Sequence, residues 1–143
     1  MMEVELEQRD IGVHLELSEN LPTITSNRVK LGQLIRLILQ DELVHLTEGQ
    51  HVFLGAEEVP GHPGESAEPC LHLWMGDDGP PVDESDLDHL FDPFFQRSDD
   101  PRDLGTNLMA SYHIVHLHGG MISEVLTQRS TSIYLYASLQ LRL

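Results

Sequence analysis

Apolar residues take every second position over residues 11–17, an alternation that predicts a β-strand. A nearly continuous apolar run at 70–76 predicts a buried strand, which stops at two aspartates, a glycine and two prolines. Other extended runs predict strands at 51–55, 121–126 and 132–142. The predicted strands are spread along the whole chain and can form one sheet.

Several segments between these strands carry apolar residues at the spacing of an α-helix. Residues 28–46 carry apolar side chains three and four positions apart without an internal proline, and Ser26 or Asn27 can cap the helix that they predict. Asp83 can cap a short helix that follows it, and residues 108–118 predict a further helix. The residues expected on the core side of this last helix are Leu108, Met109, Tyr112 and Val115. The order of elements predicts an α+β fold, a two-layer α/β sandwich in which helices cover one face of a mixed sheet.

Two carboxylates extend the apolar stripe of the long helix. Asp41 and Glu42 follow Ile38 by three and four residues, so they lie on the same face of the helix. A carboxylate on an inner face needs a partner, a cation or a water-filled pocket. The alternative is a boundary position from which both side chains reach solvent, and the sequence leaves both interpretations open.

Composition and charge limit the possible ligands. The 143 residues include 8 Lys+Arg and carry a net charge of −16, which excludes the basic face of a nucleic-acid binder. The same acidity repels anionic membranes and phosphates, so a polyphosphate ligand needs a local basic site or bound Mg²⁺. No apolar run is long enough to span a membrane. The single cysteine, Cys70, lies in a predicted core strand, which excludes a disulfide framework and indicates a cytoplasmic protein.

Several motifs follow one another in the second half of the chain. The Asp-Asp-Gly turn at 77–79 places a carboxylate at a strand end, where it can accept a hydrogen bond from a flat donor such as an adenine amino group. An aromatic cluster on a proline turn follows at 91–95, and a polar, lid-like loop at 96–104. Gly-Thr-Asn at 105–107 precedes the last helix, and His-Gly-Gly at 118–120 ends it.

In this order and separation, the motifs strongly resemble the catalytic and ATP-binding domain of sensor histidine kinases, which belongs to the GHKL superfamily with the gyrase, heat-shock chaperone and mismatch-repair ATPases. The resemblance implies a histidine-kinase-like domain over 11–143 behind a loose leading segment, 1–10. It implies a Bergerat fold in which ATP lies between helices and sheet under a lid formed by 96–104. Such a domain passes the γ-phosphoryl group to a histidine on a separate dimerisation helix.

The resemblance also implies which residues surround the nucleotide. Asp77 would take the adenine amino group, Gly79 would let the base approach, and Gly105 would lie by the phosphates at a helix start that favours anions. Asp41 and Glu42 would be the Mg²⁺ ligands, as hard oxygen donors. The full set expected to bind ATP is Asp77, Gly79, Gly105, Asn107, Asp41, Glu42, His45, Arg97 and Arg102.

The sequence departs from the family pattern where phosphates and Mg²⁺ would bind. Two asparagines and a lysine of the family's long helix are replaced, depending on the register, by Leu37, Asp41 and Val44 or by Ile38, Glu42 and His45. Pro81 replaces a glycine of the first box and removes an N–H. Asp103 and Asn107 replace the outer glycines of the later box and add side chains where phosphates pass.

These departures predict a degenerate ATP-binding domain of a two-component protein, with weak or absent nucleotide binding, that acts as a signalling or interaction module. One alternative is an active kinase domain in which Asp41 or Glu42 holds Mg²⁺. The other is an anti-sigma-like or phosphotransfer adaptor. The expected partners are a response regulator or the histidine-bearing dimerisation helices of a parent protein. Whether the chain is itself an enzyme stays open.

Histidines gather at the end of the last helix. His113 and His116 lie three residues apart and could share a metal ion. No carboxylate or cysteine completes that set at a suitable spacing, and a helix C-terminus favours surface histidines in any case. We therefore expect these side chains to lie on the surface without a metal.

Overall fold

The structure is a computed structural model that describes residues 2–60, 69–96, 103–117, 120–126 and 131–138. In chain order the elements are α1 (Met2–Gln8), β1 (Gly12–Leu17), α2 (Arg28–His45), β2 (His51–Val59), β3 (Cys70–Asp77), the 3-10 helix η1 (Glu84–His89), α3 (Asn107–Leu117), β4 (Met121–Leu126) and β5 (Thr131–Ser138). The strands and helices predicted from the hydrophobic pattern are confirmed where the structure describes them, and β2 continues four residues beyond its predicted end. Residue 118 of the last predicted helix and residues 139–142 of the last predicted strand lie outside the described residues. No helix in the described residues is long and apolar enough to cross a membrane.

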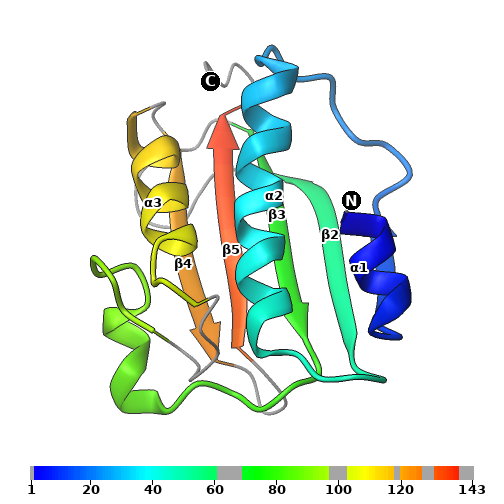
Figure 1. The fold of residues 1–143 in the computed structure, drawn as a ribbon. Coiled ribbons are helices and arrows are strands. Elements are labelled where there is room, and N and C mark those ends of the chain that lie inside the picture. The colour runs from blue at the N-terminus through cyan, green and yellow to red at the C-terminus, as the bar shows by residue number, and fades with distance from the viewer. Residues whose placement is uncertain (1, 61–68, 97–102, 118–119, 127–130, 139–143) are drawn as a thin grey trace.

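The strands form one five-stranded sheet in the order β1-β2-β3-β5-β4. β1 runs parallel to β2, whereas every other neighbouring pair is antiparallel, so the sheet is mixed. Helices α2 and α3 lie side by side across one face of this sheet (Figure 1). The predicted α+β sandwich is therefore confirmed.

The hydrophobic core fills the space between the helices and the sheet. It combines apolar side chains from α2, from strands β2 and β3 and from α3, among them Leu34, Ile38, Leu43, Val52, Met75, Leu108 and Val115. Full burial of one such side chain contributes about 1.5–3 kcal/mol, so this layer supplies the main stabilisation of the fold. Cys70 is buried, as its strand position predicted.

The first ten residues differ from the loose segment expected from the sequence. Residues 2–8 form α1, and Leu6 packs against the core. The Arg9 guanidinium donates to the carbonyl oxygen of Leu43 at 2.5 Å and also to that of Leu46. These carbonyls belong to the last turn of α2 and to its C-cap residue, where the helix has no N–H left to offer them. Arg9 therefore attaches the leading segment to the end of the long helix.

Details at the helix ends and on α3 refine the sequence predictions. Asn27 caps α2, since its Oδ1 accepts from the backbone N–H of Lys30 at 3.1 Å. Asp83 stands at the cap position of η1 but makes no capping hydrogen bond with its side chain. The prediction that Tyr112 lies in the core is wrong, because Tyr112 is 37 % exposed and its ring lies against that of His116 at a tilt of 33°. Ser111 takes the inner position instead and donates its hydroxyl to the Asn107 carbonyl at 2.8 Å.

Candidate functional site

Asp77, the last residue of β3, is buried with its carboxylate among protein donors. The backbone N–H of Gly79 donates to Oδ1 at 2.6 Å, and Oδ2 lies 3.3 Å from Nε2 of His45. A Cβ added at Gly79 would lie only 2.9 Å from Oδ1, so a glycine fits this turn best. The predicted strand-end carboxylate is therefore present, and the protein already contacts both of its oxygens.

The charge state of Asp77 follows from its surroundings. Burial on its own would raise the pKa of this carboxyl, since a low-dielectric environment disfavours the anion. Hydrogen bonds with His45 and Glu42 outweigh burial, and the charge of His45 and the Gly79 N–H act in the same direction. The pKa of Asp77 consequently falls to about 2, and the group is an anion at neutral pH.

Helix α2 supplies the two side chains that meet Asp77. Glu42 is 0 % exposed, and its Oε2 lies 3.5 Å from Nε2 of His45, one turn further along the same face. Asp41 is also buried, at 7 % exposure. The interpretation in which both carboxylates of the stripe face inward is therefore confirmed, and the boundary alternative is wrong.

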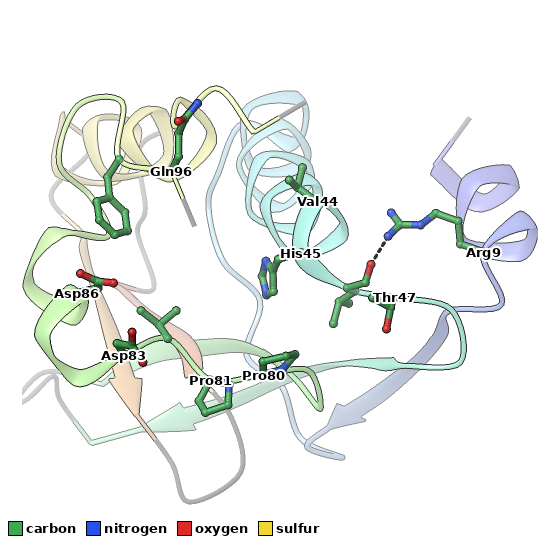
Figure 2. A pocket seen from close by; sticks show the side chains of 12 residues that line it. Arg9, Val44, His45, Thr47, Pro80, Pro81, Asp83, Asp86 and Gln96 are labelled. Carbon is green, nitrogen blue, oxygen red and sulfur yellow. Dashed lines mark hydrogen bonds between the residues drawn. The ribbon is translucent and has the colours of Figure 1, made fainter. Parts of the chain in front are cut away.

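A cavity of about 500 Å³ opens next to this cluster. Figure 2 shows His45 and Thr47 on one wall, Pro80 and Pro81 opposite them, and Gln96 at the base of the predicted lid. The volume falls within the usual range for ligand sites, roughly 300–1,000 Å³. The remaining lining residues are Arg9, Val44, Leu46, Val82, Asp83, Asp86 and Phe95.

The charge of the cavity wall is unfavourable for phosphates. Asp83 and Asp86 line it, and Val44 provides no charge at one of the positions where the family resemblance implies a lysine. Arg9 is the one arginine among the described lining residues, and its guanidinium donates to the carbonyls of Leu43 and Leu46. A triphosphate would meet two carboxylates here and a cation that is already engaged.

A second hollow, of about 260 Å³, is also lined by Val44. It is lined by Glu5, Gln40, Val44, Leu104, Thr106 and Asn107. The structure thus places Asn107, the predicted phosphate-side residue, in a wall where, among the described residues, the charged side chain is the carboxylate of Glu5. The described part of this wall offers an incoming phosphate polar groups but no positive charge.

In the structure, Gly105 forms hydrogen bonds at the base of the predicted lid. Its backbone N–H donates to Oδ1 of Asp103 at 3.1 Å, and its carbonyl accepts from the N–H of Phe94 at 3.1 Å. Gln96 donates to the carbonyl of Asp103 at 2.7 Å, which ties the two sides of the lid together at their base. The backbone N–H expected near the phosphates thus points at a carboxylate.

The structure brings together only part of the predicted ATP-binding set. Asp77, Gly79, Glu42 and His45 form one buried cluster, whereas Gly105 lies at the lid base and Asn107 in the second hollow. Asp41 contributes to the cluster through its backbone carbonyl, which lies 3.1 Å from Nδ1 of His45. The predicted arginines of the lid, Arg97 and Arg102, lie outside the described residues.

Sequence reasoning missed Arg9 as a lining residue of the cavity. The signal was available, because Glu5 and Arg9 are four residues apart and form an ion pair at 3.4 Å across the end of α1. Such a pair supports a helix, and a helix here carries its arginine toward the end of α2. The acidic residues of η1 carried no comparable signal, since their position depends on how that turn packs.

Comparison with known proteins adds an independent line of argument. No protein-family model matches the chain. The alginate biosynthesis sensor protein KinB of Pseudomonas aeruginosa is 27% identical over 117 residues, which are 82% of this chain and 18% of that protein. The sensor histidine kinase TrcS of Mycobacterium tuberculosis is 31% identical over 114 residues, 73% of this chain and 21% of that protein. The chain thus spans about a fifth of the length of these curated relatives.

Solved structures agree in fold. The nucleotide-free catalytic domain of histidine kinase ThkA superposes with a TM-score of 0.77 at 17% identity, covering 97% of this chain and 86% of that one. Full-length ShkA in complex with AMPPNP gives a TM-score of 0.72 at 19% identity over 94% of this chain and 27% of that one. ThkA in complex with the response regulator TrrA superposes with a TM-score of 0.73 at 19% identity, covering 94% of this chain and 36% of that one.

The chain is therefore related in sequence to sensor histidine kinases and has the α/β fold of their catalytic domain. Within the GHKL superfamily it belongs with the histidine kinase domains of two-component systems.

Proposed function

We propose that this chain is a degenerate ATP-binding domain of a cytoplasmic two-component protein, that its nucleotide binding is weak or absent, and that it works as a signalling or interaction module. The contacts of Asp77 carry this proposal. Its Oδ1 accepts from Gly79, and its Oδ2 faces His45 and Glu42. An adenine amino group would have to displace or share these contacts, which weakens the gain from binding.

The walls around this carboxylate support the same conclusion. The larger cavity is lined by two aspartates, and the Gly105 N–H donates to the carboxylate of Asp103. Leu37 replaces an asparagine in one of the two registers and cannot coordinate Mg²⁺, which prefers oxygen ligands. Each of these features disfavours a triphosphate, and together they favour a domain that has kept its fold and lost its phosphate site.

The partners of such a module follow from the relatives. The complex of ThkA with TrrA supports a response regulator as one partner. The second proposed partner is the pair of histidine-bearing dimerisation helices of a longer parent protein, since the curated relatives are about five times the length of the matched segment. Neither partner requires that the domain hold a nucleotide.

Calorimetry with ATP and with ADP, each with and without Mg²⁺, tests the proposal. We expect no saturable binding at ligand concentrations up to about 1 mM, which corresponds to a binding free energy weaker than about −4 kcal/mol. The double variant Leu37→Asn and Asp41→Asn should improve binding if these positions are the defect. Tight, Mg²⁺-dependent binding of ATP by the unaltered chain would contradict the proposal.

An active kinase domain is the second candidate, and the open cavity beside His45 favours it. In that case the buried Asp41 or Glu42 would hold Mg²⁺ as a carboxylate ligand. Transfer of the γ-phosphoryl group to a histidine-bearing helix supplied in trans distinguishes the two. Measurable transfer that Asp41→Ala or Glu42→Ala abolishes would favour the active domain.

A further inference from the structure

Three side chains of different chemistry converge at the junction of α2 and β3. Oε2 of Glu42, Nε2 of His45 and Oδ2 of Asp77 can each provide one ligand atom, and these atoms all lie within 4.8 Å of one another. Nε2 lies 3.3 Å from Asp77 and 3.5 Å from Glu42. Two carboxylate oxygens and one imidazole nitrogen thus surround a single point.

A backbone carbonyl fixes the orientation of His45. Its Nδ1 lies 3.1 Å from the backbone carbonyl of Asp41. Because a carbonyl only accepts hydrogen bonds, Nδ1 carries the hydrogen, and Nε2 is turned toward the two carboxylates. Histidines that bind metals almost always donate their other ring N–H to a carbonyl or carboxylate in this way.

The cluster can exchange a proton for a cation. The hydrogen bond between Glu42 and Asp77 that lowers the pKa of Asp77 requires a proton on Glu42. A metal ion that displaces this proton would meet two carboxylate oxygens and the lone pair of Nε2. The side chains of Glu42 and Asp77 are 1% and 2% exposed, and a helix and a strand hold them, so the arrangement is preorganised. His45 also lines the 500 Å³ cavity, which gives an ion access and leaves room for a water ligand.

We propose that Glu42, His45 and Asp77 form a binding site for a transition-metal dication of the Zn²⁺ type. Three protein ligands from nitrogen and carboxylate oxygen, with a fourth position open to a cavity, suit zinc. Mg²⁺ suits the site less well, since it prefers an octahedron of oxygens. Asp41 is not a ligand of this site, and its carbonyl holds His45 in place. The site shares Glu42 and Asp77 with the expected nucleotide site, so a bound metal ion would compete with ATP for these side chains.

Zinc titration of the full 143-residue chain against a chromophoric chelator tests the site. We expect the unaltered chain to bind one Zn²⁺, and His45→Ala to bind it with an affinity lower by about tenfold or more. His89→Ala is the matched control, because His89 is an exposed histidine paired with Asp92 at 2.8 Å, away from the cluster. This control should bind as the unaltered chain does. The control distinguishes Zn²⁺ binding at the cluster from Zn²⁺ binding by other histidines of the chain, which has 9 in total.

Two further measurements test the proposal even if His45→Ala does not fold. Glu42→Gln preserves the shape of the side chain and removes its charge, so Zn²⁺ should raise the melting temperature of the unaltered chain but not of this variant. X-ray absorption should show one imidazole nitrogen and oxygen ligands at about 2.0–2.2 Å. Absence of Zn²⁺ binding, equal affinity in the folded variants, or a different ligand set would overturn the assignment.

Discussion

Phe94 and Gly105 are joined across the base of the predicted lid, with the N–H of Phe94 donating to the carbonyl of Gly105 at 3.1 Å. Gly105 has a φ of +67°, in the left-handed region, and a Cβ there would lie 2.3 Å from the carbonyl carbon of Phe94. Backbone geometry and space both require a glycine here.

Gly105→Ala should therefore destabilise the fold. The strained backbone alone costs about 1–3 kcal/mol, and the contact with Phe94 adds to it. Urea denaturation followed by circular dichroism measures the change. Gly32→Ala is the matched control, since nothing lies within 4 Å of its added Cβ in helix α2, and it should stabilise by about 0.5–1 kcal/mol. Unchanged stability of Gly105→Ala would contradict the structure at this point.

Asp77 should give the protein an acid-dependent stability. Its pKa falls from 3.8 to about 2 on folding, so the stabilisation is fully present above pH 3.8 and is lost as the pH falls through 2. The shift corresponds to roughly 2 kcal/mol. Urea denaturation at several pH values should show that the stability difference between the unaltered chain and Asp77→Asn shrinks by this amount between about pH 5 and pH 2. Glu48→Gln, at an exposed position, is the control. A constant difference would show that Asp77 gains no such stabilisation.

Arg9 should contribute to stability through the end of α2. Arg9→Met keeps much of the aliphatic length but leaves the carbonyls of Leu43 and Leu46 without this donor. Hydrogen bonds to a charged group are worth about 1.5–3 kcal/mol, so denaturant unfolding should report a loss of that order. Arg36→Met, on the exposed face of α2, is the control and should change stability little. Equal effects of the two substitutions would rule out the capping role of Arg9.

Cys70 should react slowly with thiol reagents in the folded protein. The residue is 1 % exposed, and burial raises the pKa of its thiol, so little of the reactive thiolate is present. Reaction with a chromogenic disulfide should speed up strongly when urea unfolds the chain. Rapid labelling of the native protein would mean that β3 opens far more readily than its central position implies.

The fold followed from the sequence because its elements depend on local periodicity. Apolar residues alternate along the strand at Gly12–Leu17 and recur three and four positions apart along the helix at Arg28–His45. Two features of the fold could not be predicted from local periodicity. Helix α1 is held by Arg9 and Leu6 through distant contacts, and Ser111 is buried where Tyr112 was expected.

The site was predictable only in part, for a similar reason. The carboxylate and glycine of 77–79 are adjacent in sequence, so the turn that pairs them could be anticipated. The approach of His45 to Asp77 joins residues 32 positions apart, and it depends on how α2 lies on β3. Periodicity placed Glu42 on the inner face of α2 but could not show what it meets there.

The order β1-β2-β3-β5-β4 has a consequence for synthesis on the ribosome. The last strand of the chain, β5, is inserted between β3 and β4, and β4 pairs with no other strand among the described residues. One edge of β3 therefore stays unpaired during synthesis until residues 131–138 have emerged. A product truncated before these residues would leave β4 without a partner strand and β3 with an exposed edge that can associate with another chain.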